Sequence, residues 1–335
     1  MPHSLRILEL LVLLLTSASV MAEELPFPVP APVPELLMTE IASSMDGQLQ
    51  RARYWEPEAP GPHPILVSLH SWSSDCMQDH SEWLREAVAR QWVFIEPDFR
   101  GVNDHPAACG SPLARQDVLD TLDWAIHKGN IDPERIYLAG ISGGGHMAMM
   151  MAAFHPERFS AASAWVGISD LEAWYNFHAK LTEKDHYARM TEACCGGPPG
   201  LSAEVDLQYL SRSPIHFLQH AADLPLDFNA GITDGKTGSV PIQHTLNAFN
   251  VIALARQTPE ITPEEIQQLW MNGHLVSPHR TDQAADDSYG RQIHLRRSSG
   301  PSRVTLFEGG HEGLAHPACE WLGQQQRETR VKGSD

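Results

Sequence analysis

The stretch from Arg135 to Met147 constrains the fold of this chain more than any other. It reads R-I-Y-L-A-G-I-S-G-G-G-H-M. Its residues 136–138 are apolar and β-forming, which predicts a buried strand. The run rich in methionine and alanine that begins at His146 predicts a helix to about Phe154. Between strand and helix lies Gly140-Ile141-Ser142-Gly143-Gly144, a G-x-S-x-G pattern typical of a sharp strand-to-helix turn that holds a serine out at the edge of a sheet.

The residue types in this turn follow from its geometry. A turn this tight strains the backbone of the serine, and glycines two positions before and after Ser142 let the strand and the helix pass closely. The amino terminus of the helix carries partial positive charge that points at the serine hydroxyl. We therefore predict that Ser142 is a nucleophile and that the backbone N–H of Gly143 is one donor of an oxyanion hole.

The segments around this turn alternate between predicted strands and helices. An early hairpin is expected over 40–54, with Asp46-Gly47 as its turn. Further strands are expected over 65–70, 92–95, 159–168, 224–231, 293–296 and 304–307, and helices over 81–90, 112–128, 244–256, 262–271 and 318–328. Residues 171–213 are expected to be an irregular excursion over the active-site face. The order predicts an α/β fold with a mostly parallel central sheet and helices on both faces.

The amino-terminal segment predicts export. Residues 1–22 have a weakly basic start, an apolar run and small residues before a cleavage site near Ala22/Glu23, so we expect a secreted or periplasmic protein. The apolar run is too short to span a bilayer, and no stable membrane insertion is expected after cleavage. A proline-rich arm is expected over 23–45, the catalytic domain over 46–330 and a tail over 331–335. The net charge of −18 argues against nucleic acid as a partner.

Three side chains stand in the order that a serine nucleophile needs. A serine hydroxyl needs a base to take its proton, and the base needs a carboxylate that fixes its tautomer. Ser142, Asp234 and His311 each follow an apolar strand, in the order serine, acid, histidine. Asp170 also follows a predicted strand and is the alternative acid, whereas Asp227 lies within a strand. We predict that Ser142, Asp234 and His311 form a catalytic triad.

The second oxyanion donor is expected after the strand that ends at His70. A loop of small residues there is where hydrolases of this architecture place an amide, although Ser71 stands where glycine is commoner. We predict the backbone N–H of Trp72 as the donor, with Ser73 as the alternative. Three aromatic residues of the following segments are predicted to line the substrate pocket: Trp165, Trp174 and Tyr175.

Neither a metal nor a cofactor is expected. His216 and His220 are four residues apart but have no third ligand, and no cysteine has the spacing of a zinc site. His146 lies one turn into the predicted helix and is interpreted as structural, or at most as a pocket residue. An odd number of cysteines leaves at least one free, and their connectivity does not follow from the sequence. The five are Cys76, Cys109, Cys194, Cys195 and Cys319.

These motifs together resemble a known family. The residues that carry the resemblance are Phe99-Arg100-Gly101, Asp132-Pro133, the turn at Ser142, Asp234 followed by Val240-Pro241 and His244, and Gly310-His311. They are similar to the catalytic domain of the prolyl-oligopeptidase family of serine peptidases, an α/β-hydrolase fold, over roughly residues 64–321. The resemblance implies Ser142 as nucleophile, Asp234 as acid and His311 as base. Dienelactone hydrolases and secreted carbohydrate esterases share much of the pattern.

The chain departs from that family in three respects. The roughly forty residues between the predicted signal and the first sheet strand are too few for the family's β-propeller, Gly143 replaces an aromatic residue, and the loop 235–239 is longer than usual. Family likeness favours a peptide substrate. The missing propeller favours a small ester, as for a carboxylesterase or an acetyl- or feruloyl-type carbohydrate esterase. A hydrolase fold kept only for binding is the remote alternative, because such proteins typically lose a member of the triad.

Overall fold

The structure is a computed structural model that describes residues 33–180, 185–283 and 285–327. All of them belong to one compact unit, Val33–Asp335. The predicted signal peptide, the first part of the proline-rich arm and the tail lie outside the described residues. Among the helices of the described residues, none combines the length and the apolar character that crossing a membrane would need.

The described strands form a nine-stranded sheet in the order β1-β2-β4-β3-β5-β6-β7-β9-β8. The six strands from β4 to β9 in this order are parallel, and β1, β2 and β8 at the two edges are antiparallel. The predicted mostly parallel sheet is confirmed. The bounds are β1 Leu37–Ala42, β2 Leu49–Trp55, β3 His63–Leu69, β4 Val93–Pro97, β5 Ile131–Ile141, β6 Ala161–Trp165, β7 Leu226–Gly231, β8 Ile293–Ser299 and β9 Ser302–Phe307.

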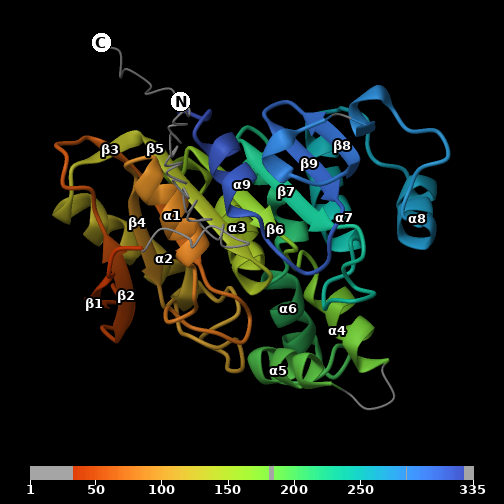
Figure 1. The fold of residues 1–335 in the computed structure, drawn as a ribbon. Coiled ribbons are helices and arrows are strands. Elements are labelled where there is room, and N and C mark those ends of the chain that lie inside the picture. Colours follow the sequence, from red (N-terminus) through yellow and green to blue (C-terminus); the bar gives the residue numbers. More distant parts are fainter. Residues whose placement is uncertain (1–32, 181–184, 284, 328–335) are drawn as a thin grey trace, which may run out of the picture. The chain divides into compact units, whose positions relative to one another are not determined.

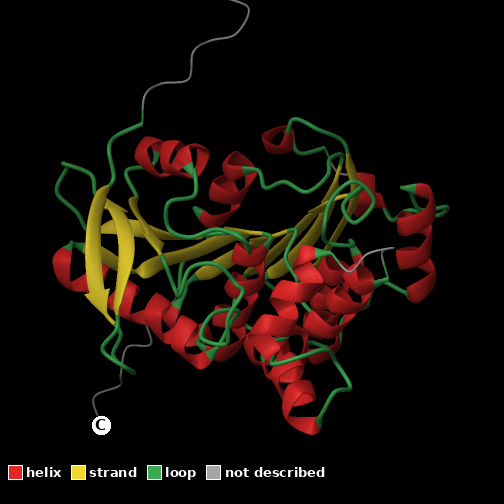
Figure 2. Ribbon diagram, turned by 90° about the horizontal axis from the view of Figure 1, so that it is seen from below, coloured by secondary structure: helices red, strands yellow, loops and turns green. Residues whose placement is uncertain are grey.

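Helices cover both faces of this sheet, as predicted (Figures 1 and 2). Their ends follow capping signals in the sequence: the Ser111 hydroxyl accepts from the Ala114 amide before α2, and Thr262 and Glu265 form a capping box at α8. The bounds are α1 Ser81–Ala89, α2 Pro112–Lys128, α3 Gly143–Phe154, α4 Leu171–Ala179, α5 His186–Cys195, α6 Ala203–Ser211, α7 Gln243–Ala255, α8 Pro263–Asn272 and α9 Ala315–Leu322.

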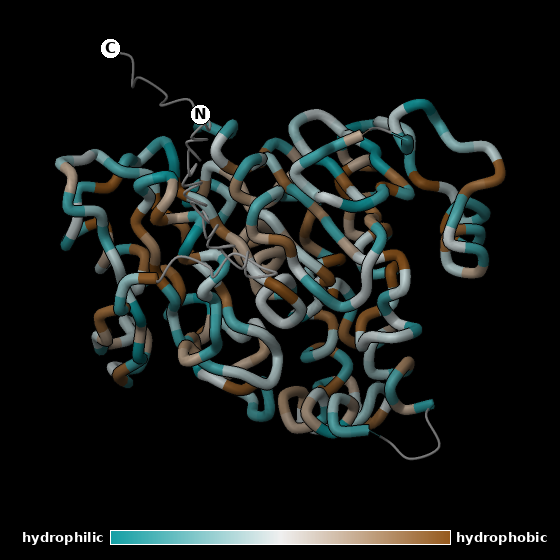
Figure 3. The backbone as a smooth tube through the Cα atoms, viewed as in Figure 1, coloured by the Kyte–Doolittle hydropathy of each residue, from teal (hydrophilic) through white to brown (hydrophobic). Residues whose placement is uncertain are grey.

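Helix α3, which follows Ser142, is almost completely buried. Every residue of α3 except Phe154 is buried, so the helix is apolar on all sides rather than along one stripe. It packs on β5, β6 and β3. Figure 3 shows hydrophobic residues gathered in such central elements and hydrophilic ones in many of the outer loops. The core therefore surrounds the helix that follows Ser142.

Three parts of the structure differ from the expectation. Strand β1 begins at Leu37, so the sheet starts within the segment 23–45 that was expected to be an arm. The excursion 171–213 is not irregular, because α4, α5 and α6 lie in it, capped by the side chains of Asp170, Asp185 and Ser202. The final helix is also earlier than 318–328, since α9 ends at Leu322.

Candidate active site

Ser142 lies in the sharp turn between β5 and α3. Its φ of 59° and ψ of −115° are a strained conformation for a residue with a side chain. Two backbone bonds hold it there: its N–H donates to the Trp165 carbonyl at 2.8 Å, and its carbonyl accepts from the His146 N–H at 2.9 Å. The residue is 7% exposed. Strain held by the surrounding sheet and helix presents the hydroxyl at the end of the strand.

The glycines after Ser142 permit close packing in this turn. A Cβ on Gly143 would lie 2.3 Å from the backbone nitrogen of Trp72, and one on Gly144 would lie 2.1 Å from the carbonyl oxygen of Leu69. Any side chain at these two positions would collide with main chain. The main chain of residue 143 therefore lies against that of residue 72, and their amides stay the predicted oxyanion donors.

Asp234 and His311 are joined directly. His311 Nδ1–H donates to the Asp234 carboxylate, at 2.9 Å to Oδ2 and 3.1 Å to Oδ1. Asp234 is fully buried and also accepts from the backbone N–H of Gly235 at 2.8 Å. Because Nδ1 carries the proton in the neutral ring, Nε2 is the nitrogen that can accept a proton. These residues follow β7 and β9, two parallel strands that end at the same sheet edge as β5.

Ser142 and His311 line the same cavity, which has a volume of about 490 Å³. His311 is partly open to it, with 24% of its side chain exposed. Among the hydrogen bonds of the described residues, His311 Nε2 pairs with the hydroxyl of Ser239 at 3.3 Å and not with that of Ser142. The other residues that line the cavity are Ser71, Trp72, Ser73, Ser74, Gln78, Ile141, Tyr187, Glu312 and Gly313.

The loop after β3 is braced against the turn at Ser142. The Ser71 hydroxyl donates to the Ile141 carbonyl at 3.2 Å, and the Ser71 N–H donates to Gln78 Oε1 at 2.7 Å. Gln78 Nε2 donates back to the Ser71 hydroxyl at 3.2 Å. Ser71, where glycine is commoner, thus ties the two halves of the predicted oxyanion hole together. Sequence reasoning missed Gln78, because only the fold brings it to Ser71.

The three aromatic residues predicted for the pocket are buried and are not among the residues that line this cavity. Trp165 packs within the sheet core, and Tyr175 hydrogen bonds Glu192 at 2.6 Å. Trp174 lies behind the lining, with its ring centroid 4.6 Å from that of Trp72 and 5.2 Å from that of Tyr187. Tyr187 of α5 is the excursion's aromatic side chain at the cavity. Nothing in the sequence around Tyr187 distinguishes it from the other aromatic residues of the excursion.

The alternative acids have other partners. The carboxylate of Asp170 caps α4 by accepting from the Ala173 N–H at 3.0 Å. Asp227 accepts from the Ser163 hydroxyl at 2.8 Å and from Arg303 Nε at 2.7 Å. Both carboxylates are therefore explained by structural bonds, which leaves Asp234 as the carboxylate on His311.

His146 and the cysteines are buried among structural groups. His146 Nε2–H donates to the Arg212 carbonyl at 2.7 Å, and burial lowers the pKa of His146 to about 4. No group of three or more possible metal ligands occurs among the described residues, which include His216 and His220. All five cysteines are buried free thiols, and burial raises the pKa of Cys76 to about 12.

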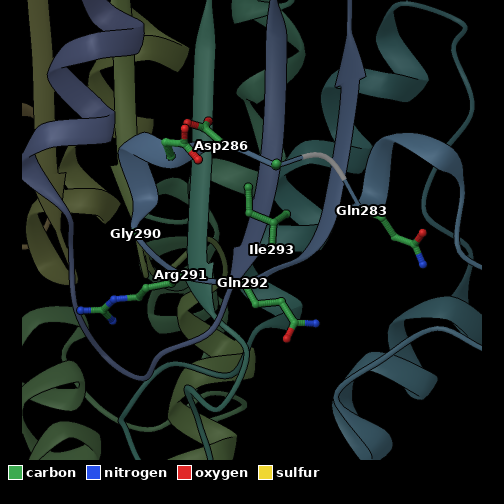
Figure 4. Close-up of a pocket in the computed structure, with 8 residues that line it drawn as sticks. Gln283, Asp286, Gly290, Arg291, Gln292 and Ile293 are labelled. Atoms are coloured by element: carbon green, nitrogen blue, oxygen red, sulfur yellow. The ribbon is translucent and has the colours of Figure 1, made fainter.

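A second cavity of about 490 Å³ is lined by Asp286, Arg291 and Ile293, among others (Figure 4). Its Arg291 donates to Glu312, which lines the cavity of Ser142, at 2.7 Å. Partial burial acts to raise the pKa of the Glu312 carboxyl, but the bonds from Arg291 and from the Gly310 amide outweigh it and lower that pKa. An ion pair thus joins a residue of one cavity to a residue of the other, next in sequence to His311.

Known proteins resemble this chain in sequence and in fold. Residues 114–193 match the model of the prolyl oligopeptidase family. Feruloyl esterase B of Neurospora crassa is 32% identical over 115 residues, which cover 31% of this chain and 39% of that protein. Carboxylesterase NlhH of Mycobacterium tuberculosis is 31% identical over 132 residues, 37% of this chain and 40% of that protein. The chain thus matches about two fifths of the length of these curated relatives.

Among solved structures, the uncomplexed acylaminoacyl peptidase of Pyrococcus horikoshii superposes with a TM-score of 0.53 at 17% sequence identity, over 67% of this chain and 36% of that one. A puromycin-hydrolysing peptidase of Mycobacterium tuberculosis superposes with a TM-score of 0.53 at 15% identity, over 86% of this chain and 37% of that one. At these identities the likeness concerns the fold. The sheet order and these neighbours together show an α/β-hydrolase fold. The resemblance to the prolyl oligopeptidase family is confirmed by the family match over 114–193.

Proposed function

We propose that this protein is a serine esterase that cleaves short acyl or aryl-acyl esters through a triad of Ser142, Asp234 and His311 and an acyl-enzyme. The observation that carries the proposal is the cavity shared by Ser142 and His311, with Asp234 on the far side of the imidazole. In the proposal, this cavity holds the nucleophile and its base, and the amides of Gly143 and Trp72 serve as oxyanion donors. The relatives of about 30% sequence identity bear the names of esterases.

The first half-reaction forms the acyl-enzyme. Ser142 Oγ attacks the ester carbonyl while His311 Nε2 takes its proton. The amides of Gly143 and Trp72 receive the charge that develops on the carbonyl oxygen, and loss of one such donor costs about 10²–10³-fold in rate. Asp234 holds the tautomer and stabilises the imidazolium. The His311 imidazolium then protonates the leaving alcohol, and the ester bond breaks.

The second half-reaction regenerates the enzyme. Water takes the place of the alcohol, gives a proton to His311 Nε2 and attacks the acyl carbon. Collapse of the tetrahedral intermediate returns the proton to Ser142 and releases the acid. In the resting geometry the Ser239 hydroxyl bonds Nε2, and this bond must give way to one with the Ser142 hydroxyl during the reaction. Catalytic hydrogen bonds are often looser without substrate.

The lining of the cavity supports an ester of a polyhydroxylated alcohol. The hydroxyl-bearing residues Ser73 and Ser74 line the cavity with Ser142, and Tyr187 supplies an aromatic surface. Such a mixture of polar groups and one ring suits a sugar hydroxyl or a phenolic acyl group. The printed names of the relatives, feruloyl and acetylxylan esterase, agree with this chemistry.

A peptidase is the second candidate, and the match to the prolyl oligopeptidase family favours it. An amine leaving group depends more on protonation by His311 than an alcohol does.

We also propose that the protein is exported through residues 1–22. Amino-terminal sequencing of the protein recovered outside the cytoplasm should then begin at Glu23, and an intact Met1 would contradict export with cleavage.

A substrate panel tests the proposal. Purified protein would be assayed with p-nitrophenyl acetate, methyl ferulate, acetylated xylo-oligosaccharides and aminoacyl p-nitroanilides. We expect turnover of the esters, little of the anilides, and fluorophosphonate labelling that Ser142→Ala abolishes. Turnover confined to the anilides would replace the esterase by the peptidase. Labelling that persists in Ser142→Ala would remove Ser142 as the nucleophile.

A further inference from the structure

We propose that Ser239 is a positioning residue for the catalytic base and that it couples His311 to helix α4 of the excursion. The inference rests on the proposed function, because it takes His311 as the base of Ser142. Ser239 ends the loop 235–239, the segment whose length departs from the family pattern. Its hydroxyl contacts the base directly, and its carbonyl contacts two side chains of α4.

The loop is packed against the acid and the base. A Cβ on Gly238 would lie 2.2 Å from Asp234 Oδ1 and 2.5 Å from His311 Cβ, so the main chain of the loop touches both. Gly235 has a φ of +82°, and a Cβ there would lie 2.5 Å from Pro241 Cα. Glycine at these two positions allows the loop to fold back on the pair it follows.

The Ser239 hydroxyl restrains the nitrogen that does the chemistry. Nδ1–H of His311 is committed to Asp234, so Nε2 is an acceptor and the Ser239 O–H donates to it at 3.3 Å. A hydroxyl both donates and accepts. Ser239 can therefore bond the neutral ring at rest and, after rotation of its hydrogen, share the Nε2–H of the protonated ring with the leaving alcohol. It restrains the imidazole between the proton transfers, yields Nε2 to Ser142 during them and takes no proton itself.

Helix α4 fixes the position of Ser239. The Ser239 carbonyl accepts from Trp174 Nε1–H at 2.8 Å and from His178 Nε2–H at 2.9 Å. His178 is buried, and its other ring nitrogen lies 2.5 Å from the Asp185 carboxylate at the start of α5. Two neighbouring helices of the excursion thus hold the residue that bonds the base. A shift of α4 would move the Ser239 hydroxyl relative to His311.

Four variants test this coupling in steady-state and burst kinetics with p-nitrophenyl acetate. Ser239→Ala should lower kcat about twofold to tenfold with little change in KM, the range expected for loss of one neutral hydrogen bond. Ser239→Thr, which keeps the hydroxyl, should recover most of that loss. Trp174→Phe should lower kcat in the wild-type background and have no further effect on Ser239→Ala. Thr237→Ala, in the same loop, should leave kcat unchanged because the Thr237 hydroxyl bonds Thr233 instead.

The outcomes separate this inference from the proposed function. Wild-type kcat in Ser239→Ala, equal losses in the Ala and Thr variants, or multiplying effects of the Trp174 and Ser239 changes would each overturn it. Thermal unfolding of every variant shows whether a lower kcat reflects folding instead. His311→Ala is the reference: if it retains full activity, the proposed function fails, whereas its loss together with a silent Ser239→Ala overturns only the positioning role.

Discussion

The elbow region, defined as β3, β5 and α3, and the excursion 171–213 meet at the same cavity but are built differently. In the elbow region main chain packs on main chain, and glycines at 143 and 144 make this possible. The excursion leaves large apolar side chains exposed, among them Leu201 at 61% and Leu207 at 59%. Its Tyr187 side chain lines the cavity, and its Trp174 donates a hydrogen bond to the carbonyl of Ser239, which contacts His311.

From this difference we expect the elbow region to determine the rate of the reaction and the excursion to determine which substrates are preferred. In the proposed mechanism the elbow region fixes the nucleophile and the amides, where a displacement of a fraction of an ångström changes the rate. The excursion is a set of short capped helices, which can change its contacts at lower cost to the core. Substitutions in the two regions should therefore differ in kind, with losses of kcat and stability in the first and changes of substrate preference in the second.

The largest effect is expected at the carboxylate that supports His311, the proposed base for the nucleophile of the elbow region. Asp234→Asn keeps the shape of the side chain but loses the charge that fixes the His311 tautomer. We expect kcat on p-nitrophenyl acetate to fall by about 10⁴-fold with little change in melting temperature. Asp170→Asn is the matched control, because Asp170 caps α4. A comparable loss in that control would show that the acid had been misassigned.

The next largest effect is a pH dependence of the free energy of unfolding, which we expect from His146 in helix α3. Burial lowers the pKa of His146 to about 4, below the value of 6.5 for an unfolded histidine. A depressed pKa means that the unfolded state binds the proton first, so this stability is complete above pH 6.5 and is lost as the pH falls towards about 4. His146 should contribute on the order of 3 kcal/mol to that loss.

Urea unfolding between pH 7.5 and 4 measures this contribution. His146→Gln keeps a donor for the Arg212 carbonyl and cannot titrate, so its free energy of unfolding should fall less with acid. The residual slope should include His244, whose pKa burial also lowers to about 4. Identical slopes for wild type and His146→Gln would refute the role of His146.

Glycines of the two regions offer a more direct contrast. An alanine Cβ at Gly144 meets the Leu69 carbonyl, whereas one at Gly200 in the excursion meets no atom within 4 Å. Gly144→Ala should lower the free energy of unfolding by about 1–3 kcal/mol or prevent folding, because main chain must move. Gly200 has a φ of +82°, so Gly200→Ala costs backbone strain alone, about 1 kcal/mol. Equal losses would remove the contrast between the regions.

The sequence allowed much of the elbow region to be predicted. Strand, G-x-S-x-G and helix are contiguous, and α2 and the parallel strands followed from local periodicity. The excursion was predicted to be irregular because its helices are short, although Asp170, Asp185 and Ser202 are capping residues. Gln78 and Ser239 carry no pattern of their own. Their contacts depend on loops that the fold brings together from distant parts of the chain.

The smallest effect is expected at the excursion's side chain in the cavity. Tyr187→Leu removes an aromatic surface from the lining while keeping apolar contact with Trp174. We expect kcat/KM on methyl ferulate to fall about twofold to tenfold, since one aromatic pair is worth about 0.5–1.5 kcal/mol, and kcat/KM on p-nitrophenyl acetate to fall less. The ratio of the two values isolates selectivity from any general loss. A change confined to the acetate substrate would place Tyr187 with the chemistry of the elbow region instead, because a small acyl group makes little use of a distant ring.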